Sequence, residues 1–560
     1  MTNSIEEIGD AACIFAIGTN TTNQHPVISL EIKKAVRKGG KLIVADPRQI
    51  DLCDIADIWL QQKPGTDVAL MMGMMKVIVD EGLQDQEFID NKCENFDEFK
   101  GSLAEFELNK VSEITGVPAE DVAAAARMYA TNSPASLLYC MGITQHTHGT
   151  DNVLGTANLA MLTGNIGKLS SGVNPLRGQN NVQGACDLGA LPNVITGYQQ
   201  VADEKVRQKF EKAWGVQLAA EPGMVLTEMF HAMGEGHLKA VYLMGENPVL
   251  SDPDANHIKE ALEKLEFLVV QDIFLTETAQ YADVVLPAAS FAEKEGTFAN
   301  TERRVQRVRK ILEPIGQSKA DWEITCAIAK KMEAKGYDFA NAQKVFEEIA
   351  KVTPSYGGIS YERLDNEGGL QWPCPDAEHP GTKFLHKGNI VRGKGRFAPL
   401  TYRPSDEQPD SEYPLILTTG RSPYHYHTGT MTRKTEGLNI LGPEERVWIN
   451  PEDAQSLGIA DGEMVTVTSR RGTVEARARV TDRSQKGVVF MTFHYAEASA
   501  NVLTNPALDP VCKTPELKVC AVKVQKESGV TADAAEASAE EPTPAEVETP
   551  AEPEPEAAAA

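Results

Sequence analysis

The strongest constraint on the fold is an ordered set of three short apolar runs that occurs twice along the chain. In each set the first run ends in Gly, the second ends in Asp and the third follows an Ala-Asp pair. Continuous apolar runs of this kind, separated by helical stretches, are typical of buried parallel strands. We therefore predict an α/β protein with two related, doubly wound units. The runs are 13–18, 41–46 and 56–61 in the first unit, and 239–245, 267–272 and 282–287 in the second.

The pattern changes near residue 413 to five short Val- and Thr-rich runs separated by Gly and Asp turns, at 414–418, 446–449, 462–469, 472–480 and 487–493. These runs predict a small β-barrel. Beyond residue 526 the chain is mostly Ala, Glu and Pro, and it cannot bury enough apolar surface to offset the entropy lost on ordering. We therefore expect two α/β domains at 1–179 and 180–292, a helical and irregular connecting region at 293–403, a barrel domain at 404–526 and a disordered acidic tail at 527–560.

Charge and cysteine content exclude several classes of function. With 54 Lys and Arg against 80 Asp and Glu, the net charge of −26 argues against a nucleic-acid partner. No stretch approaches the roughly 18 consecutive apolar residues of a membrane span, so we expect no direct membrane insertion. The nine cysteines form no C-x-x-C pair and predict neither a disulfide framework nor a closed zinc or iron–sulfur site. Scattered thiols are typical of a reducing compartment, so we expect the protein in the cytoplasm.

Each predicted α/β unit has a Gly and an Asp where parallel strands end, which is where such sheets bind ligands. These residues are Gly18 and Asp46 in the first unit, and Gly245 and Asp272 in the second. The Asp carboxylates could accept hydrogen bonds from a ribose or a base. Ordinary loop chemistry is the alternative at any single position, with Gly at positive φ and Asp as a helix cap. Because the set is duplicated, we favour a nucleotide-like ligand, and without a G-x-G-x-x-G or Walker loop neither a nicotinamide dinucleotide nor ATP is indicated.

The segment 172–187 is an aperiodic loop rich in Gly, Asn and Gln, with Arg177 as its one cation. Its amides are costly to bury unless they bind something polar. The guanidinium could hold a small oxyanion through two parallel hydrogen bonds. A structural arginine satisfied by backbone carbonyls is an equal alternative.

For the other candidate residues, a structural or surface role is a simple alternative to ligand binding. His146 and His148 lie two apart on a loop, which gives no facing geometry, so we assign no metal ligand. Arg421 beside His425 suits a phosphate, although a solvated loop would show the same pattern. Lys518, late in the barrel, is most simply a surface charge.

Several motifs, in order from about residue 3 to about residue 525, resemble the catalytic alpha subunits of molybdenum- or tungsten-dependent formate dehydrogenases, in the molybdopterin oxidoreductase family. The loop 172–187 and residues 141–149 are the most specific of them. The acidic tail lies outside the resemblance. The other motifs are residues 18–20 with 25–26, 46–48, 160–165, 245–248, 270–274, 371–374 and 513–516.

The resemblance implies a bis(molybdopterin guanine dinucleotide) cofactor with Mo or W, one dinucleotide in each α/β unit and both capped by the barrel, which would be of the double-psi type. It implies the following cofactor-binding residues by position in the motifs. One guanosine site would be lined by Asn20, Asp46, Arg48, Gly65 and Asp67, and the other by Gly245, Asp272 and Thr276. Met141, Gln145 and Gln179 would approach the pterin and the metal, and the barrel would contribute Arg421, His425, Asn501 and Lys518.

Arg177 matches the arginine that orients formate in this family, and the resemblance implies a catalytic role for it. Formate would lose a hydride equivalent to the metal centre and leave as CO2, while the protein positions the reactants and supplies electrostatic stabilisation. The implied partners are formate, CO2 and one or more iron–sulfur electron-transfer subunits.

The sequence departs from the family pattern at its beginning. Family members carry an upstream domain with a [4Fe–4S] cluster and then a selenocysteine or cysteine that ligates the metal, and neither is present. We expect this chain to be the downstream part of a selenoenzyme whose UGA codon was read as a stop, and to be inactive alone. Translation of the upstream DNA in frame tests this expectation.

Two other functions fit the same motifs. One is a related enzyme with another substrate, such as a nitrate reductase. The other is a non-catalytic subunit that uses the scaffold for docking; retention of the Asp, Arg and Gln residues at the cofactor positions disfavours it.

Overall fold

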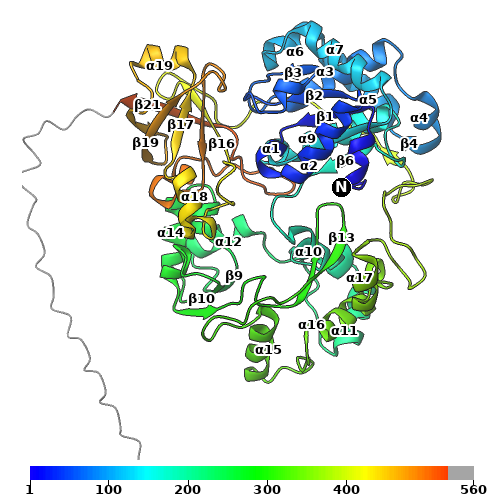
Figure 1. Ribbon diagram of the computed structural model, residues 1–560, viewed down its shortest axis with the longest axis vertical. Helices are drawn as coiled ribbons and strands as arrows, with labels where there is room; N and C mark the ends of the chain where they lie inside the picture. The colour runs from blue at the N-terminus through cyan, green and yellow to red at the C-terminus, as the bar shows by residue number, and fades with distance from the viewer. Residues whose placement is uncertain (527–560) are drawn as a thin grey trace, which may run out of the picture.

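The computed structural model describes residues 1–526, so the predicted disorder of 527–560 lies outside the described residues. Figure 1 shows the first α/β unit beside the barrel, with the second α/β unit below the barrel and the connecting region below the first unit. This arrangement confirms the predicted α/β architecture with a C-terminal barrel. Within the described part of the chain, no helix combines the length and apolar character needed to cross a bilayer.

The first unit is built on a five-stranded parallel sheet with the order β3-β2-β1-β5-β6. Helices cover both of its faces, with α3, α7 and α9 on one core and α2 on the other. The segment 172–187, which has no periodic pattern in the sequence, begins as a strand in the structure. Its first residues pair with β5 and form the edge strand β6. The strands are β1 (Cys13–Ile17), β2 (Lys41–Ala45), β3 (Ile58–Leu60), β5 (Ala135–Tyr139) and β6 (Gly172–Pro175), and the main helices are α2 (Pro26–Arg37), α3 (Asp67–Asp80), α7 (Ala119–Thr131) and α9 (Gly149–Leu162).

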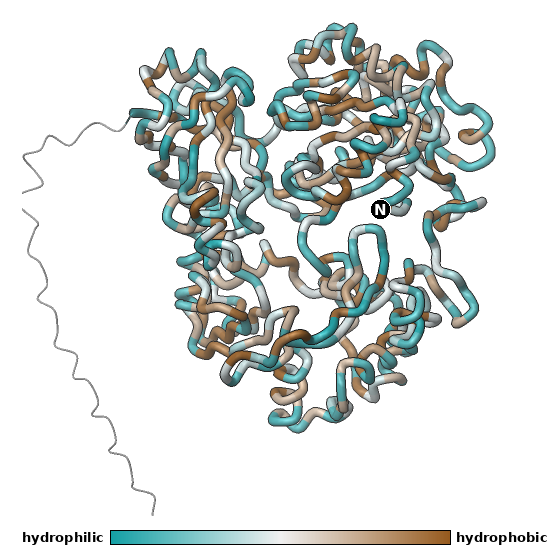
Figure 2. Tube along the Cα trace, viewed as in Figure 1, coloured by the Kyte–Doolittle hydropathy of each residue, from teal (hydrophilic) through white to brown (hydrophobic). Residues whose placement is uncertain are grey.

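The helix α3 is central to this unit because it is apolar on all sides. A helix of that kind is stable only when it is enclosed, and α3 packs between α6, α7 and α9 with Leu70, Met71 and Met74 fully buried. Figure 2 shows apolar segments inside this unit, inside the second unit and along the barrel. The smaller elements are α1 (Thr21–Gln24), α4 (Gln86–Lys92), β4 (Cys93–Glu94), α5 (Phe96–Ser102), α6 (Leu108–Thr115) and α8 (Met141–Thr144).

The second unit repeats the strand order of the first, with β11-β10-β9 in place of β3-β2-β1. Hydrogen bonds repeat as well: Gly18 N donates to Ala45 O at 3.0 Å, and Gly245 N donates to Gln271 O at 2.9 Å. Helices α12 and α14 cover one face of the sheet. On the other face Tyr242 remains 44% exposed. The elements are α10 (Val182–Asp187), β7 (Val194–Ile195), β8 (Gln199–Gln200), α11 (Glu204–Trp214), α12 (Leu226–Gly234), β9 (Ala240–Met244), α13 (Pro248–Ser251), α14 (Ala255–Glu263), β10 (Phe267–Asp272) and β11 (Val284–Pro287).

The connecting region contains a small antiparallel sheet, β12-β13-β14, in addition to the predicted helices. The strands β12 and β13 form a local hairpin, whereas β14 joins it through residues distant in sequence, such as Leu370 with Val305, so local sequence patterns do not reveal the third strand. The guanidinium of Arg303 is buried here among backbone carbonyls, including those of Met1 and Thr382. The elements are β12 (Gly296–Ala299), β13 (Arg304–Val308), α15 (Asp321–Lys331), α16 (Ala342–Val352), α17 (Tyr361–Glu367), β14 (Leu370–Gln371) and β15 (Gly395–Arg396).

The C-terminal part is a closed barrel with the strand order β16-β20-β17-β19-β18-β21. Alternate residues of β19 point inward, namely Val474, Ala476 and Ala478, as a half-buried strand requires. The sixth strand, β21, was not among the predicted runs. The elements are β16 (Leu415–Gly420), α18 (Glu436–Leu441), β17 (Arg446–Ile449), α19 (Pro451–Leu457), β18 (Met464–Thr468), β19 (Thr473–Val480), β20 (Val488–Thr492) and β21 (Cys520–Lys526).

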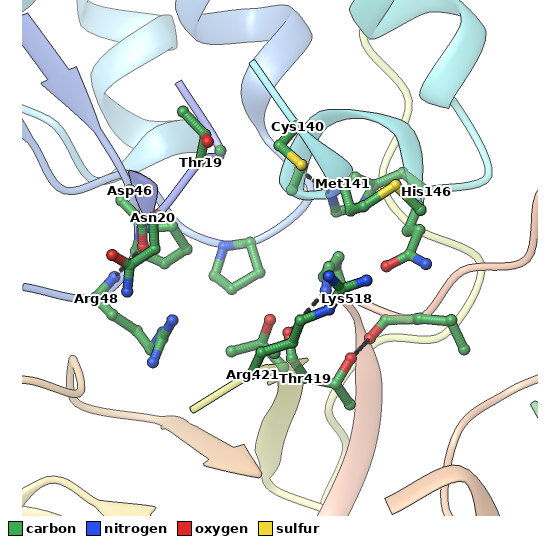
Figure 3. Close-up of a pocket in the computed structure, with 18 of the residues that line it drawn as sticks. Thr19, Asn20, Asp46, Arg48, Cys140, Met141, His146, Thr419, Arg421 and Lys518 are labelled. Carbon is green, nitrogen blue, oxygen red and sulfur yellow. Dashed lines mark hydrogen bonds between the residues drawn. The ribbon is translucent and has the colours of Figure 1, made fainter. Parts of the chain in front are cut away.

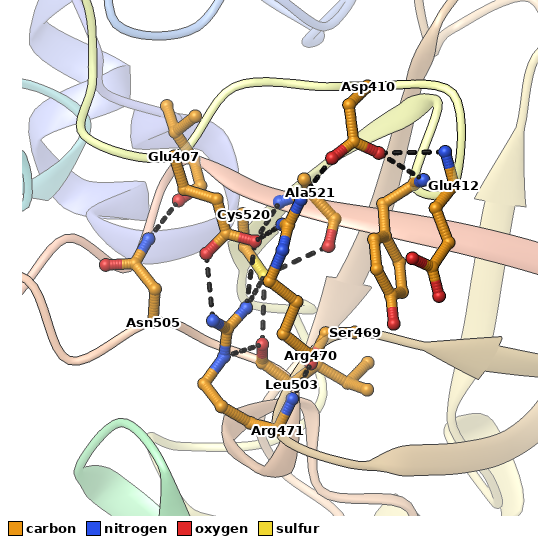
Figure 4. A network of polar contacts seen from close by, with 12 residues as sticks. Glu407, Asp410, Glu412, Ser469, Arg470, Arg471, Leu503, Asn505, Cys520 and Ala521 are labelled. Atoms are coloured by element: carbon orange, nitrogen blue, oxygen red, sulfur yellow. Dashed lines mark hydrogen bonds and ion pairs between the residues drawn. The ribbon is translucent and has the colours of Figure 1, made fainter.

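A polar network fastens the segment before the barrel to the barrel itself (Figure 4). The carboxylate of Glu407 accepts hydrogen bonds from Arg470 Nη1 at 2.7 Å and from Ala521 N at 3.1 Å, and it pairs with Arg471 Nη1 at 2.9 Å. Arg471 Nε also donates to Leu503 O at 2.9 Å. Glu407 thereby ties β21 to the turn between β18 and β19.

Candidate functional site

A cavity of about 1190 Å³, part of it open to solvent, lies between the first sheet and the barrel. The carboxyl ends of β1, β2 and β5 form one wall, because parallel strands end at the same edge of their sheet. The end of β16 and the residues before β21 form the opposite wall. The predicted residues that line it are Asn20, Asp46, Arg48, Gly65, Asp67, Met141, Gln145, Gln179, Arg421, Asn501 and Lys518.

Three cations reach this cavity from different segments: Arg48, Arg421 and Lys518. Figure 3 shows Arg421 and Lys518 projecting from the barrel toward Cys140 and Met141. Burial lowers the pKa of both guanidinium groups from their ordinary value. Among residues 1–526, none of the three forms an ion pair with a carboxylate.

The pKa of Lys518 is strongly lowered as well. Burial, together with the positive charges of Arg421 and Arg48, lowers its pKa to about 7. Its Nζ donates one hydrogen bond, to Thr419 O at 2.7 Å. A cluster of partly buried positive charges is costly unless an anion joins it, so this wall suits a ligand that carries phosphates.

Two buried carboxylates, Asp46 and Asp67, complete the polar lining. Burial raises the pKa of each above its ordinary value. Asp46 Oδ1 accepts from Arg48 N at 3.0 Å, and Asp67 Oδ1 accepts from Gln62 Nε2 at 3.0 Å. Their remaining oxygens can accept hydrogen bonds from amino or hydroxyl groups of a ligand.

The floor of the cavity requires two glycines. Gly142 N donates to Gly18 O at 3.1 Å, which brings the ends of β1 and β5 into backbone contact. A Cβ on Gly142 would lie 2.6 Å from Gly18 Cα, and Gly18 itself has φ +58°. The need for Gly142 depends on this contact between two strands, so the sequence alone does not indicate it.

Unsatisfied polar atoms in the cavity wall test whether a polar ligand fits. In the described part of the chain Thr19 Oγ1, Asn20 Oδ1 and Gln62 Oε1 are buried without a hydrogen-bond partner. Buried polar groups normally have partners. Together with the three unpaired cations, these atoms fit a phosphate-bearing dinucleotide with hydrogen-bonding rings.

Arg177 lies next to this cavity but outside its lining. Its backbone is held by Thr301 Oγ1, which accepts from Arg177 N at 3.0 Å, and by His25 Nε2, which lies 3.0 Å from Arg177 O. Its Nη1 lies 3.4 Å from Cys186 Sγ. No carboxylate pairs with this guanidinium in residues 1–526.

The helix after Arg177 is anchored by Asp187, which is 1% exposed. Its carboxylate accepts four hydrogen bonds from neutral donors, at 2.6 Å from Gln183 Nε2, 2.8 Å from Tyr198 OH, 2.7 Å from Tyr356 OH and 2.6 Å from Trp372 Nε1. Two of the donors belong to the connecting region. The predicted candidates did not include Asp187, because its partners lie up to 185 positions away.

Four predicted residues lie away from the cavity: Gly245, Asp272, Thr276 and His425. The first three are at the strand ends of the second unit, where burial raises the pKa of Asp272. His425 is buried in the barrel with Nε2 at 2.7 Å from Gly442 O. The cavity residues that were not predicted include Thr19, Cys140, His146, Ser251, Thr419, His427 and Phe493, most of which are near neighbours of predicted ones in the sequence.

His146 lies between the two walls. Its Nε2 is 2.9 Å from Gly142 O, and its Nδ1 is 3.6 Å from Glu516 Oε1 of the barrel. Its ring stacks on that of His148 with centroids 5.3 Å apart. Among the residues that the structure describes, no group of three or more His, Cys, Asp or Glu side chains has an arrangement that could hold a metal ion.

The fold and the cavity define an α/β protein with a polar cavity, lined by three cations, between the edge of a sheet and a barrel. Residues 1–331 match the family model "Molybdopterin oxidoreductase", and residues 415–521 match the "Molydopterin dinucleotide binding domain". The chain belongs to the molybdopterin oxidoreductase family, which confirms the resemblance. The second match also supports a molybdopterin cofactor.

The relatives extend this assignment. The chain is 52% identical over 529 residues to the F420-dependent formate dehydrogenase subunit alpha of Methanocaldococcus jannaschii, covering 94% of this chain and 78% of that one. It is 38% identical to the assimilatory nitrate reductase catalytic subunit of Bacillus subtilis, covering 94% and 76%. The solved structure of acetylene hydratase from Pelobacter acetylenicus has the same fold, with a TM-score of 0.74 at 23% identity over 94% of this chain and 80% of that chain.

Proposed function

We propose that this chain belongs to the catalytic subunit of a formate dehydrogenase that binds bis(molybdopterin guanine dinucleotide) carrying Mo or W. The observation that carries the cofactor proposal is the set of three unpaired cations at the edge of the first sheet. The bound cofactor would supply a metal centre that accepts two electrons. The 52% identity to a subunit of formate dehydrogenase favours formate as the substrate.

The first unit and the barrel would hold one dinucleotide. Arg48, Arg421 and Lys518 would bind its phosphates, while Asp46 and Asp67 would accept hydrogen bonds from its polar rings. The second dinucleotide would lie at the equivalent strand ends of the second unit, at Gly245, Asp272 and Thr276. The repeated strand order and the repeated hydrogen bond after β1 and β9 support this assignment.

Arg177 would bind the carboxylate of formate by two parallel hydrogen bonds. The guanidinium is free of any carboxylate partner in residues 1–526. Its neighbours Gly178 and Gln179 reach the cavity wall: a Cβ on Gly178 would lie 2.7 Å from Arg421 Nη1. Formate would leave as CO2 after releasing one proton and two electrons, and the role of Arg177 is to fix the C–H bond in the reactive direction.

The two electrons must leave the protein, and we propose an iron–sulfur electron-transfer subunit as the partner. The location we propose is the cytoplasm. All nine cysteines are free, and free thiols are typical of a reducing compartment.

Analysis of the native holoprotein, isolated from its own cells, tests the proposal. We expect a pterin, GMP released on acid hydrolysis, and Mo or W. The same preparation should reduce a viologen dye with formate and should not oxidise reduced viologen with nitrate. A native protein without pterin contradicts the cofactor, and nitrate turnover without formate turnover would favour the nitrate reductase-like alternative.

A further inference from the structure

Lys518 occupies an unusual position for an amine. It immediately precedes β21 in the barrel, and its side chain lines the cavity. Its one hydrogen bond is to the carbonyl of Thr419, at 2.7 Å. A lysine in such a place loses water without gaining a negative partner.

The charged groups that face Lys518 come from three other segments. Arg421 follows β16 and Arg48 follows β2, and both oppose its protonation. Cys140 follows β5 and Asp46 follows β2, and both favour protonation, although more weakly than the guanidinium groups oppose it. Positive potential therefore prevails at the Nζ atom while the cavity holds no anion.

We propose that Lys518 takes up a proton when a phosphate-bearing ligand enters the cavity, so that anion binding and protonation of this amine are coupled. This inference rests on the proposed function, because it assumes that the cavity takes an anion. An anion placed among Arg48, Arg421 and Lys518 cancels the repulsion between the cations and favours the charged ammonium. Lys518 would then contribute a charge that it lacks in the free protein.

The sign of the pH dependence follows from the pKa of Lys518 in the free protein, about 7. Above that pH the free amine is mostly neutral, whereas the amine beside the bound anion is charged. Binding at about pH 8 should take up close to one proton, and affinity should fall up to about tenfold per pH unit above pH 7. Below that pH the amine is already protonated and the coupling disappears.

Isothermal titration calorimetry tests the coupling. The full chain, purified free of cofactor, is titrated with guanosine 5′-diphosphate. Titrations at about pH 8 in two buffers with different ionisation enthalpies give the number of protons taken up. We expect a clear net uptake of protons, of at most one, for the unmodified chain. Lys518→Arg should bind with no uptake, because a guanidinium remains charged. Lys486→Arg, at an exposed lysine paired with Glu452, should keep the full uptake.

Three results would overturn the coupling. Binding of guanosine diphosphate without proton uptake would refute it while leaving the anion site in place. Equal uptake by Lys518→Arg would assign the proton to another group. If the unmodified chain does not bind the nucleotide at all, both the coupling and the proposed anion site fail. Lys518→Met provides a second variant, for which we expect weaker binding and no uptake.

Discussion

At the scale of single residues, the cavity depends on a close backbone contact between two glycines and on cationic side chains that have no carboxylate partner. Gly142 and Gly18 lie in contact because the strands β1 and β5 run side by side. Arg48 bridges the two walls: its backbone follows Asp46, and its guanidinium carbon lies 3.6 Å from the centroid of the Phe490 ring in the barrel. A cation over an aromatic face is stabilised there even when water is excluded, so Arg48 can remain charged and face an anion.

Gly142→Ala should destabilise the protein, because the new Cβ would lie 2.6 Å from the backbone of Gly18. We expect a loss of about 1–3 kcal/mol in the free energy of unfolding, measured in urea. Gly101→Ala is the control, since this glycine lies in α5 with open space where a Cβ would be. Equal stability of the two variants would mean that the two strand ends separate without cost.

Arg177→Ala should lower kcat/KM for formate about 10²–10³-fold in the native holoenzyme, since the substrate carboxylate would lose its oriented charge partner. Metal and pterin content should not change, because Arg177 does not line the cavity. Arg309→Ala removes a guanidinium that is 60% exposed and should leave turnover unaltered. Full activity of Arg177→Ala would remove the role assigned to this residue.

At the scale of elements, two patterns place the site. Parallel strands bring Asn20, Asp46 and Met141 to one edge, although they are distant in sequence. The loop with Arg177 is stabilised by the carboxylate of Asp187 in α10. Hydrogen bonds to a buried carboxylate are stronger than those between neutral groups, and four of them converge on Asp187.

Asp187→Asn should loosen the segment that follows Arg177. The amide keeps one acceptor but turns an NH2 group toward two of the four donors. We expect a local cost of about 1–3 kcal/mol, seen as faster hydrogen exchange in residues 177–198 with unchanged exchange in the barrel. Glu313→Gln, at a side chain that is 84% exposed, is the matched control. Unchanged exchange in that segment would show that Asp187 does not order the loop.

At the scale of the whole molecule, the barrel is attached to the first unit by a carboxylate at the N-terminus of a helix. Asp509, in the barrel's long loop, accepts from Thr150 N at 2.8 Å and from Thr150 Oγ1 at 2.9 Å at the start of α9. Glu516, from the same loop, is fully buried beside His146. The wall that carries Lys518 is therefore held against the first sheet by contacts that span more than 350 positions.

Asp509→Ala should weaken this attachment. A carboxylate that caps a helix contributes about 1–2 kcal/mol, and its loss should separate the unfolding of the barrel from that of the first unit in calorimetry. Asp203→Ala removes a comparable cap within one unit, at the start of α11, and should lower stability without separating the transitions. A single transition for Asp509→Ala would contradict an attachment through this residue.

The same contact has a pH dependence with a definite sign. Burial alone would raise the pKa of Asp509, but hydrogen bonds from the amides of Thr150, Cys512 and Val511 hold it below its ordinary value. The stabilisation is therefore present above the ordinary pKa of an aspartate and is lost as the pH falls through the lowered value. Asp509→Ala should show less acid destabilisation than the unmodified chain.

Local patterns determined a large part of this protein. Apolar runs that end in Gly or Asp predicted β1, β2, β9 and β10 and their duplication, because strand formation and burial leave a periodicity in the sequence itself. Val-rich runs predicted five of the barrel strands for the same reason. The motifs also indicated the family, which the comparisons confirm.

Only the tertiary structure decided how these parts combine. It placed the strand ends of the first unit opposite the barrel around one cavity, to which the second unit contributes Ser251. In the structure β21 pairs with β16 and β18, the close contact with Gly18 requires a glycine at position 142, and four hydrogen-bond donors surround Asp187. It also placed Lys518, which by sequence is most simply a surface charge, between two guanidinium groups. These outcomes depend on contacts between residues tens to hundreds of positions apart, and such contacts leave no periodic trace in the local sequence.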